Sequence, residues 1–119
     1  MITEEQLPDM LGDEIPLLNV EFEKLARISS AYASIQCFTD YTKRVLLEGN
    51  INMAKNCFEI AEKMMHRGSR IIQNAMSNVF LFSISQFMDT TKKNHELLMK
   101  LLKGDLRKEY CRQINSCNH

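Results

Sequence analysis

The sequence has few of the residues that tight turns require, with four glycines and two prolines among 119 residues. An all-β fold of this length needs more of them, so a sheet protein is disfavoured. No stretch approaches the roughly 18 apolar residues of a membrane-spanning helix, and we expect no membrane contact. The first residues, Met1 to Glu5, are acidic where a secretory signal carries basic residues, which favours a cytoplasmic location.

Recognisable motifs of enzyme chemistry are also missing. The sequence contains no glycine-rich phosphate loop, no His-Glu-x-x-His, no nucleophile elbow and no Cys-x-x-Cys. The three histidines, His66, His95 and His119, stand far apart in the chain. We therefore expect no catalytic activity and no cofactor.

The cysteines offer one alternative to this expectation. Cys111, Cys117 and His119 could bind a metal ion, with His95 as a fourth ligand. Their spacing matches no familiar zinc pattern, so we expect reduced thiols and no metal.

Apolar residues recur at helical spacing from Phe22 to Ile114, and no alternating strand pattern is present. One stripe covers residues 25–46 and ends before Gly49, and a second helix follows, capped by Asn50 or Asn52. Cys37 and Cys57 occupy core positions in this pattern.

Three further helices complete the prediction. The third starts after the cap Ser69, the fourth runs from about Asp89 to Lys103, and a short last helix follows Gly104, capped by Asp105. The sequence thus predicts an all-α fold, a compact bundle of about five helices with antiparallel, repeat-like helical hairpins. We expect residues 1–119 to form a single domain.

The net charge is zero, but the charges are divided unevenly. Residues 1–23 hold seven acids and no Lys or Arg, and the rest of the chain carries an excess of bases. We expect this acidic segment to dock on the basic body, and residues 112–119 to form a mobile tail. Four apolar residues of the segment are expected to be buried: Leu17, Leu18, Val20 and Phe22.

The third helix is apolar on every side around residues 79–82, which is typical of a helix that is surrounded or meets a second chain. We predict a twofold dimer with Leu81 and Phe82 at the contact, and central burial is the alternative. Asn74 and Asn78 lie one turn apart on the same helix. They either line a polar groove or form a bridge between helices.

Residues 35–68 resemble a tetratricopeptide-type helical hairpin. Ala54, Phe58 and Ala61 occupy the small, large and small positions of the second helix of such a repeat, and Gly49 occupies its turn. Small residues let two helices approach closely, while the Phe of such a repeat fills the gap between successive hairpins. His66 replaces the usual terminal Pro.

Four short sequence segments also resemble those of a family of small, uncharacterised bacterial helical proteins. They are Phe38-Thr-Asp-Tyr-Thr-Lys, Gly49-Asn, Ile71-Ile-Gln-Asn-Ala-Met-Ser-Asn-Val-Phe-Leu and Leu101-Leu-Lys-Gly-Asp-Leu-Arg-Lys-Glu-Tyr. This resemblance implies a cytoplasmic helical bundle and no particular activity.

The function expected from these features is a small protein-binding or adaptor module that binds a protein, a peptide or a second copy of itself. An immunity or antitoxin-like protein is one alternative. A second alternative is weak binding of nucleic acid through the basic C-terminal helices. It is disfavoured because Asp105 and Glu109 are interleaved with the bases.

Overall fold

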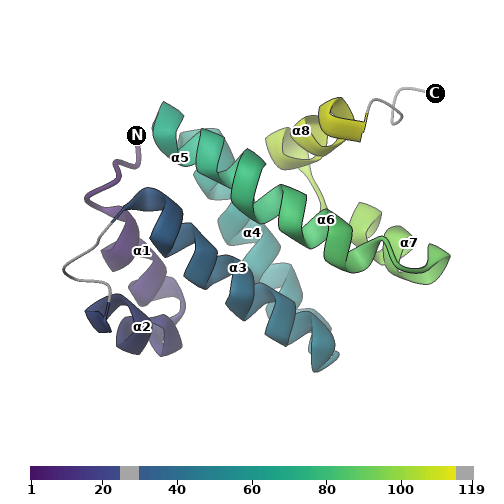
Figure 1. The fold of residues 1–119 in the computed structure, drawn as a ribbon, viewed down its shortest axis with the longest axis horizontal. Coiled ribbons are helices and arrows are strands. Elements are labelled where there is room, and N and C mark those ends of the chain that lie inside the picture. Colours follow the sequence, from purple (N-terminus) through teal and green to yellow (C-terminus); the bar gives the residue numbers. More distant parts are fainter. Residues whose placement is uncertain (25–29, 115–119) are drawn as a thin grey trace.

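The computed structural model describes residues 1–24 and 30–114, and every regular element in these ranges is helical (Figure 1). The all-α prediction is therefore confirmed. The elements are α1 (Leu7–Glu14), η1 (Pro16–Leu18), α2 (Asn19–Lys24), α3 (Ala31–Leu47), α4 (Ile51–Arg67), α5 (Arg70–Ala75), η2 (Met76–Leu81), α6 (Phe82–Met88), α7 (Lys92–Leu101) and α8 (Gly104–Ile114). The first part of the predicted stripe, at residues 25–29, lies outside the described residues.

Short polar side chains begin the main helices, as their positions in the sequence predict. The side-chain oxygen of Asn50 accepts a hydrogen bond from the Met53 amide at 3.1 Å, and Ser69 accepts one from Ile72 at 3.3 Å. Such caps satisfy amides that have no partner within the helix. Gly49 ends α3 with a φ of 73°, a conformation that glycine adopts without a steric penalty.

Three phenylalanines join α3, α4 and η2 in the centre of the core. The Phe38 and Phe80 rings stack with centroids 5.2 Å apart, and Phe58 meets Phe80 edge-on at 5.8 Å. Phe58 and Ala61 are both buried, as the helical pattern predicts.

Elements α5, η2 and α6 form one long helix over residues 70–88, with a π-helical turn at Met76–Leu81. It packs against α3 on one side and α8 on another, so its buried surface is wide. Leu81 lies within this surface and is 0% exposed, whereas Phe82 is 52% exposed. For Leu81 the structure therefore favours the alternative of central burial over a place at a dimer contact.

Glu62 of α4 holds α8 in place. Its carboxylate accepts hydrogen bonds from the amides of Asp105 at 2.9 Å and Leu106 at 2.7 Å. A Cβ at Gly104, whose φ is 56°, would collide with this carboxylate. The N-terminus of α8 is thus capped by another helix, which corrects the prediction that Asp105 caps it.

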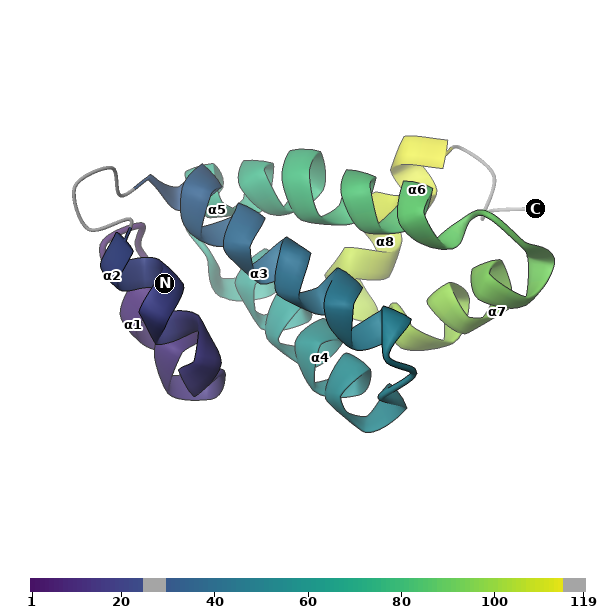
Figure 2. The same cartoon turned by 60° about the horizontal axis from the view of Figure 1, so that its bottom comes forward.

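The acidic N-terminal segment lies beside α3 (Figure 2). Its contacts with the body are mainly apolar. Leu7, Leu11 and Leu18 are buried, and within the described residues one ion pair, Glu14–Lys63 at 3.8 Å, reaches the body.

Two of the four apolar side chains expected to be buried are instead exposed. Leu17 is 73% exposed and Val20 is 59% exposed, while Leu18 is buried and Phe22 is half-buried. The short turn at Pro16–Leu18 directs only Leu18 toward the core, which explains the exposure of Leu17.

The C-terminal end differs from the prediction of a tail over residues 112–119. Helix α8 continues to Ile114, so Arg112 and Gln113 are helical, and residues 115–119 lie outside the described residues. Across the described ranges, none of the helices is both long enough and apolar enough to cross a membrane.

Candidate interaction groove

The long helix over residues 70–88 has an unusual outer face. Between Arg70 and Asp89 the sequence contains no Asp, Glu, Lys, Arg or His, although a quarter of the whole chain is charged. Its inner side is core, but one side faces solvent. The exposed residues on that side are Ile71, Asn74, Asn78, Phe82 and Gln86, and we call this set the uncharged face.

A groove lies at the edge of the uncharged face, where the long helix meets α8. It has a volume of about 430 Å³, and its lining residues are Ser77, Asn78, Phe82, Arg112 and Gln113. The Gln113 side-chain amide donates a hydrogen bond to the Ser77 carbonyl at 2.9 Å, which fixes the end of α8 against the π-helical turn. Turns of this kind occur frequently at functional sites.

The one cationic group of this groove is paired. Arg112 donates from Nε to Glu109 Oε1 at 2.7 Å, and Gln113 donates to the other carboxylate oxygen at 3.3 Å. These contacts lower the pKa of Glu109 and raise that of Arg112, since each charge stabilises the other. The groove therefore presents little net charge beside Asn78 and Phe82.

The groove brings together two residues that the sequence indicated separately. Asn78, predicted to line a polar groove, and Phe82, predicted at an interface, both line it. Asn74 is exposed on the same face but outside the groove, and Leu81 is in the core. Sequence reasoning missed Arg112 and Gln113. The absence of charge over residues 71–88 was the available signal for the face itself.

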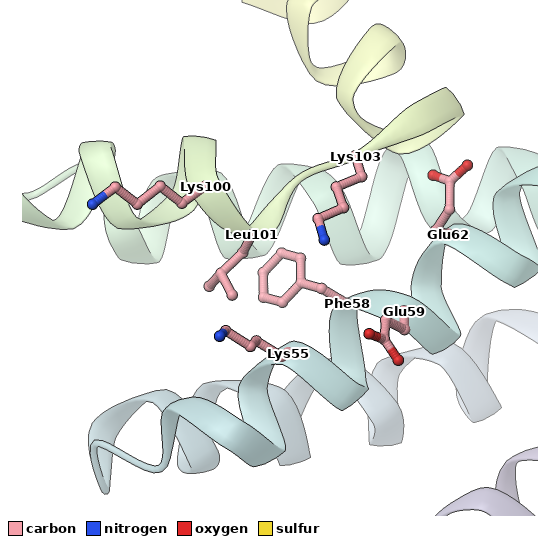
Figure 3. Close-up of a pocket in the computed structure, with 7 residues that line it drawn as sticks. All are labelled: Lys55, Phe58, Glu59, Glu62, Lys100, Leu101 and Lys103. Atoms are coloured by element: carbon pink, nitrogen blue, oxygen red, sulfur yellow. The ribbon is translucent and has the colours of Figure 1, made fainter.

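A second hollow, of about 420 Å³, lies between α4 and α7 (Figure 3). The amino groups of Lys55 and Lys103 lie on opposite sides of Phe58, while Lys100 points away. Glu62, at its edge, is engaged by the α8 amides. The lining of this hollow has three lysines and two glutamates around the apolar side chains of Phe58 and Leu101, so its charges largely offset one another. Its lining residues are Lys55, Phe58, Glu59, Glu62, Lys100, Leu101 and Lys103, a set without a nucleophile paired to a base.

The two histidines within the described residues each pair with one acid rather than with each other. His66 Nδ1 lies 2.7 Å from Asp105 Oδ2, and His95 Nδ1 lies 2.7 Å from Asp89 Oδ1. The hydrogen bond from His66 lowers the pKa of Asp105.

Metal ligands do not gather in the part of the chain that the structure describes. Within residues 1–24 and 30–114 no three His, Cys, Asp or Glu side chains lie together as ligands would. Cys117 and His119 of the alternative metal cluster lie outside these ranges. Burial raises the pKa of the Cys57 thiol to about 11, which makes it a poor ligand and a poor nucleophile.

Over its described residues the chain is thus a small all-α domain whose long helix presents an uncharged face to solvent. The chain belongs to the family of the domain of unknown function DUF7674, whose model matches residues 8–116. No curated protein and no solved structure matches the chain.

Proposed function

We propose that the protein is a non-catalytic, protein-binding module that contacts its partner through the uncharged face and the groove beside α8. The observation that carries this proposal is the half-exposed Phe82 ring, which lies beside Asn78 at an open groove on a helix face without charge.

The composition of this face matches that of interface cores. Such cores are depleted of charged residues and enriched in aromatic ones, while their rims are polar. Phe82 supplies an aromatic anchor, and Asn74 and Asn78 supply hydrogen-bonding groups. The Arg112–Glu109 ion pair lies at the rim of the face. Interface rims stay accessible to water, so a partner can bind without removing the hydration of this pair.

The hairpin of α3 and α4 also supports the proposal of a protein-binding module. Residues 35–68 resemble a tetratricopeptide-type hairpin, and the small and large positions Ala54, Phe58 and Ala61 are buried. We also propose a location in the bacterial cytoplasm, which the resemblance to small bacterial helical proteins implies.

A second candidate, an immunity or antitoxin-like protein, is favoured by the N-terminal segment. Asp9 and Asp13 are exposed and, within the described residues, form no ion pair, and Leu17 and Val20 are exposed nearby in sequence. A basic protein would suit such a surface. Nucleic acid is a weaker candidate, because Lys108 and Arg112 each pair with an acid of α8.

Site-specific cross-linking in cells tests the proposal. A photoreactive amino acid at position 82 is expected to capture one defined protein, and the same group at Leu47, which is exposed at the far end of α3, is not. Phe82→Glu should then weaken binding of the purified partner by about 30-fold, the loss of a central aromatic anchor. Equal capture at positions 47 and 82, or capture only through position 13, contradicts this assignment. The last result favours the acidic surface.

A further inference from the structure

We infer that the occupant of the uncharged face is a second copy of this chain, in a twofold dimer whose axis passes beside Asn78 and Phe82. The Phe82 ring of each copy enters the groove beside α8 of the other. This inference rests on the proposed function, because it names the partner of the same surface.

The charge pattern favours an identical partner. In a twofold contact each residue near the axis lies close to its own symmetry mate, so a charged residue there meets a like charge. No ionisable side chain lies between Arg70 and Asp89, and the uncharged face is free of this repulsion along its whole length. A strongly basic or acidic partner would gain nothing from such a face.

The polar groups of the face are also complementary to themselves. A side-chain amide is both donor and acceptor, so Asn78 of one copy can bond to Asn78 of the other. Asn74 and Gln86, one to two turns away along the helix, carry the same kind of group. The open groove beside Phe82 gives the opposing ring a concave surface to pack against.

The uncharged face follows the whole length of the long helix. A standard interface takes about 800 Å² from each partner. The molecule is flat, with extents of 43, 30 and 19 Å, and the long helix runs across its broad face (Figure 1).

Sedimentation velocity with charge variants of Asn78 tests the dimer. The wild-type chain is expected to sediment as a dimer at micromolar concentration. Asn78→Lys and Asn78→Glu should each be monomeric, because two like charges then meet at the axis. An equimolar mixture of the two variants should restore the dimer. Asn78 is exposed, so both variants should fold, which circular dichroism checks.

Leu47→Glu is the matched control, because Leu47 is exposed at the end of α3, and it should remain dimeric. A monomeric wild type overturns the inference, and so does a dimer that both Asn78 variants leave intact. If the wild type is monomeric but position 82 still captures a different protein, the proposed function stands and only the dimer fails. If position 82 captures nothing, both fail.

Discussion

Phe58 reaches from α4 into the aromatic cluster of Phe38 and Phe80, and its side chain is almost fully buried. Phe58→Ala removes one ring of this cluster and leaves a cavity. We expect it to lower the free energy of unfolding by about 3–5 kcal/mol, measured by urea denaturation.

Glu59→Ala is the control for this experiment, because Glu59 is the exposed neighbour of Phe58 on the same helix. Glu62 is unsuitable, since its carboxylate caps α8. Equal midpoints for Phe58→Ala and Glu59→Ala would contradict the packing described here.

Cys57 is buried in the core, and loss of hydration raises the pKa of its thiol to about 11. The group is therefore almost wholly protonated near pH 8, and a thiol reagent should modify it only when the chain opens. Cys37, which the helical pattern placed in the core, is half-exposed, as is Cys111, and both should react faster than Cys57.

Replacing Cys57 with Ala identifies the part of the thiol modification that comes from Cys57. The Cys57→Ala variant should keep the full fast phase of modification by a chromogenic disulfide and lose amplitude in the slow phase alone. Loss of fast amplitude would show that the Cys57 thiol is accessible.

At the scale of single elements, α8 depends on Glu62. Its carboxylate accepts from two amides at the start of α8, and hydrogen bonds to a charged group are stronger than neutral ones. Glu62→Ala should therefore destabilise the protein by about 1–2 kcal/mol, in the range of a lost helix cap.

Hydrogen exchange locates this effect. The amides of Asp105 and Leu106 should lose protection in Glu62→Ala before the amides of α4 do, and Glu59→Ala should leave them unchanged. Uniform loss of protection over the whole chain would indicate that α8 is not held by this contact.

Helix α1 is held mainly by burial rather than by charge. Leu11 is 0% exposed, whereas the Glu14–Lys63 pair is partly solvated at 3.8 Å. We expect Leu11→Ala to cost about 2–5 kcal/mol. Lys63→Ala should cost less than about 1 kcal/mol.

Proteolysis at low and high salt separates these two contributions. The N-terminal segment should stay protected in wild type and Lys63→Ala at both salt concentrations, and Leu11→Ala should expose it. Release of the segment from wild type by salt alone would show that charge holds it.

The helix ends were predictable because their causes are local. Asn50, Ser69 and Gly49 act on amides or turns within a few residues. The cap of α8 was not predictable, since Glu62 lies 43 residues before Asp105 in the chain. The spacing of residues along a helix does not distinguish an acid that faces water from an acid that caps another helix.

The candidate site was predictable only in part for a similar reason. Asn78 and Phe82 lie four residues apart on one helix, so the helical repeat alone places them on the same face. The burial of Leu81 depends on helices that flank it, and the contributions of Arg112 and Gln113 depend on how α8 docks. These are tertiary effects that no local pattern contains.

At the scale of the whole molecule, the long helix is both the centre of the core and part of the surface. Its inner side joins α3 and α8, and its outer side carries the uncharged face. A helix without charged residues is typically buried on most sides. A second copy packed on the outer side would complete the burial of the long helix.

Nuclear magnetic resonance of the backbone and side-chain amides, followed from low micromolar to millimolar protein, tests this central claim most directly. We predict concentration-dependent shifts confined to the uncharged face and the groove, with the side-chain amides of Asn78 and Gln113 among the largest. Spectra that do not change with concentration, or shifts centred on α1 and α2, would contradict the account.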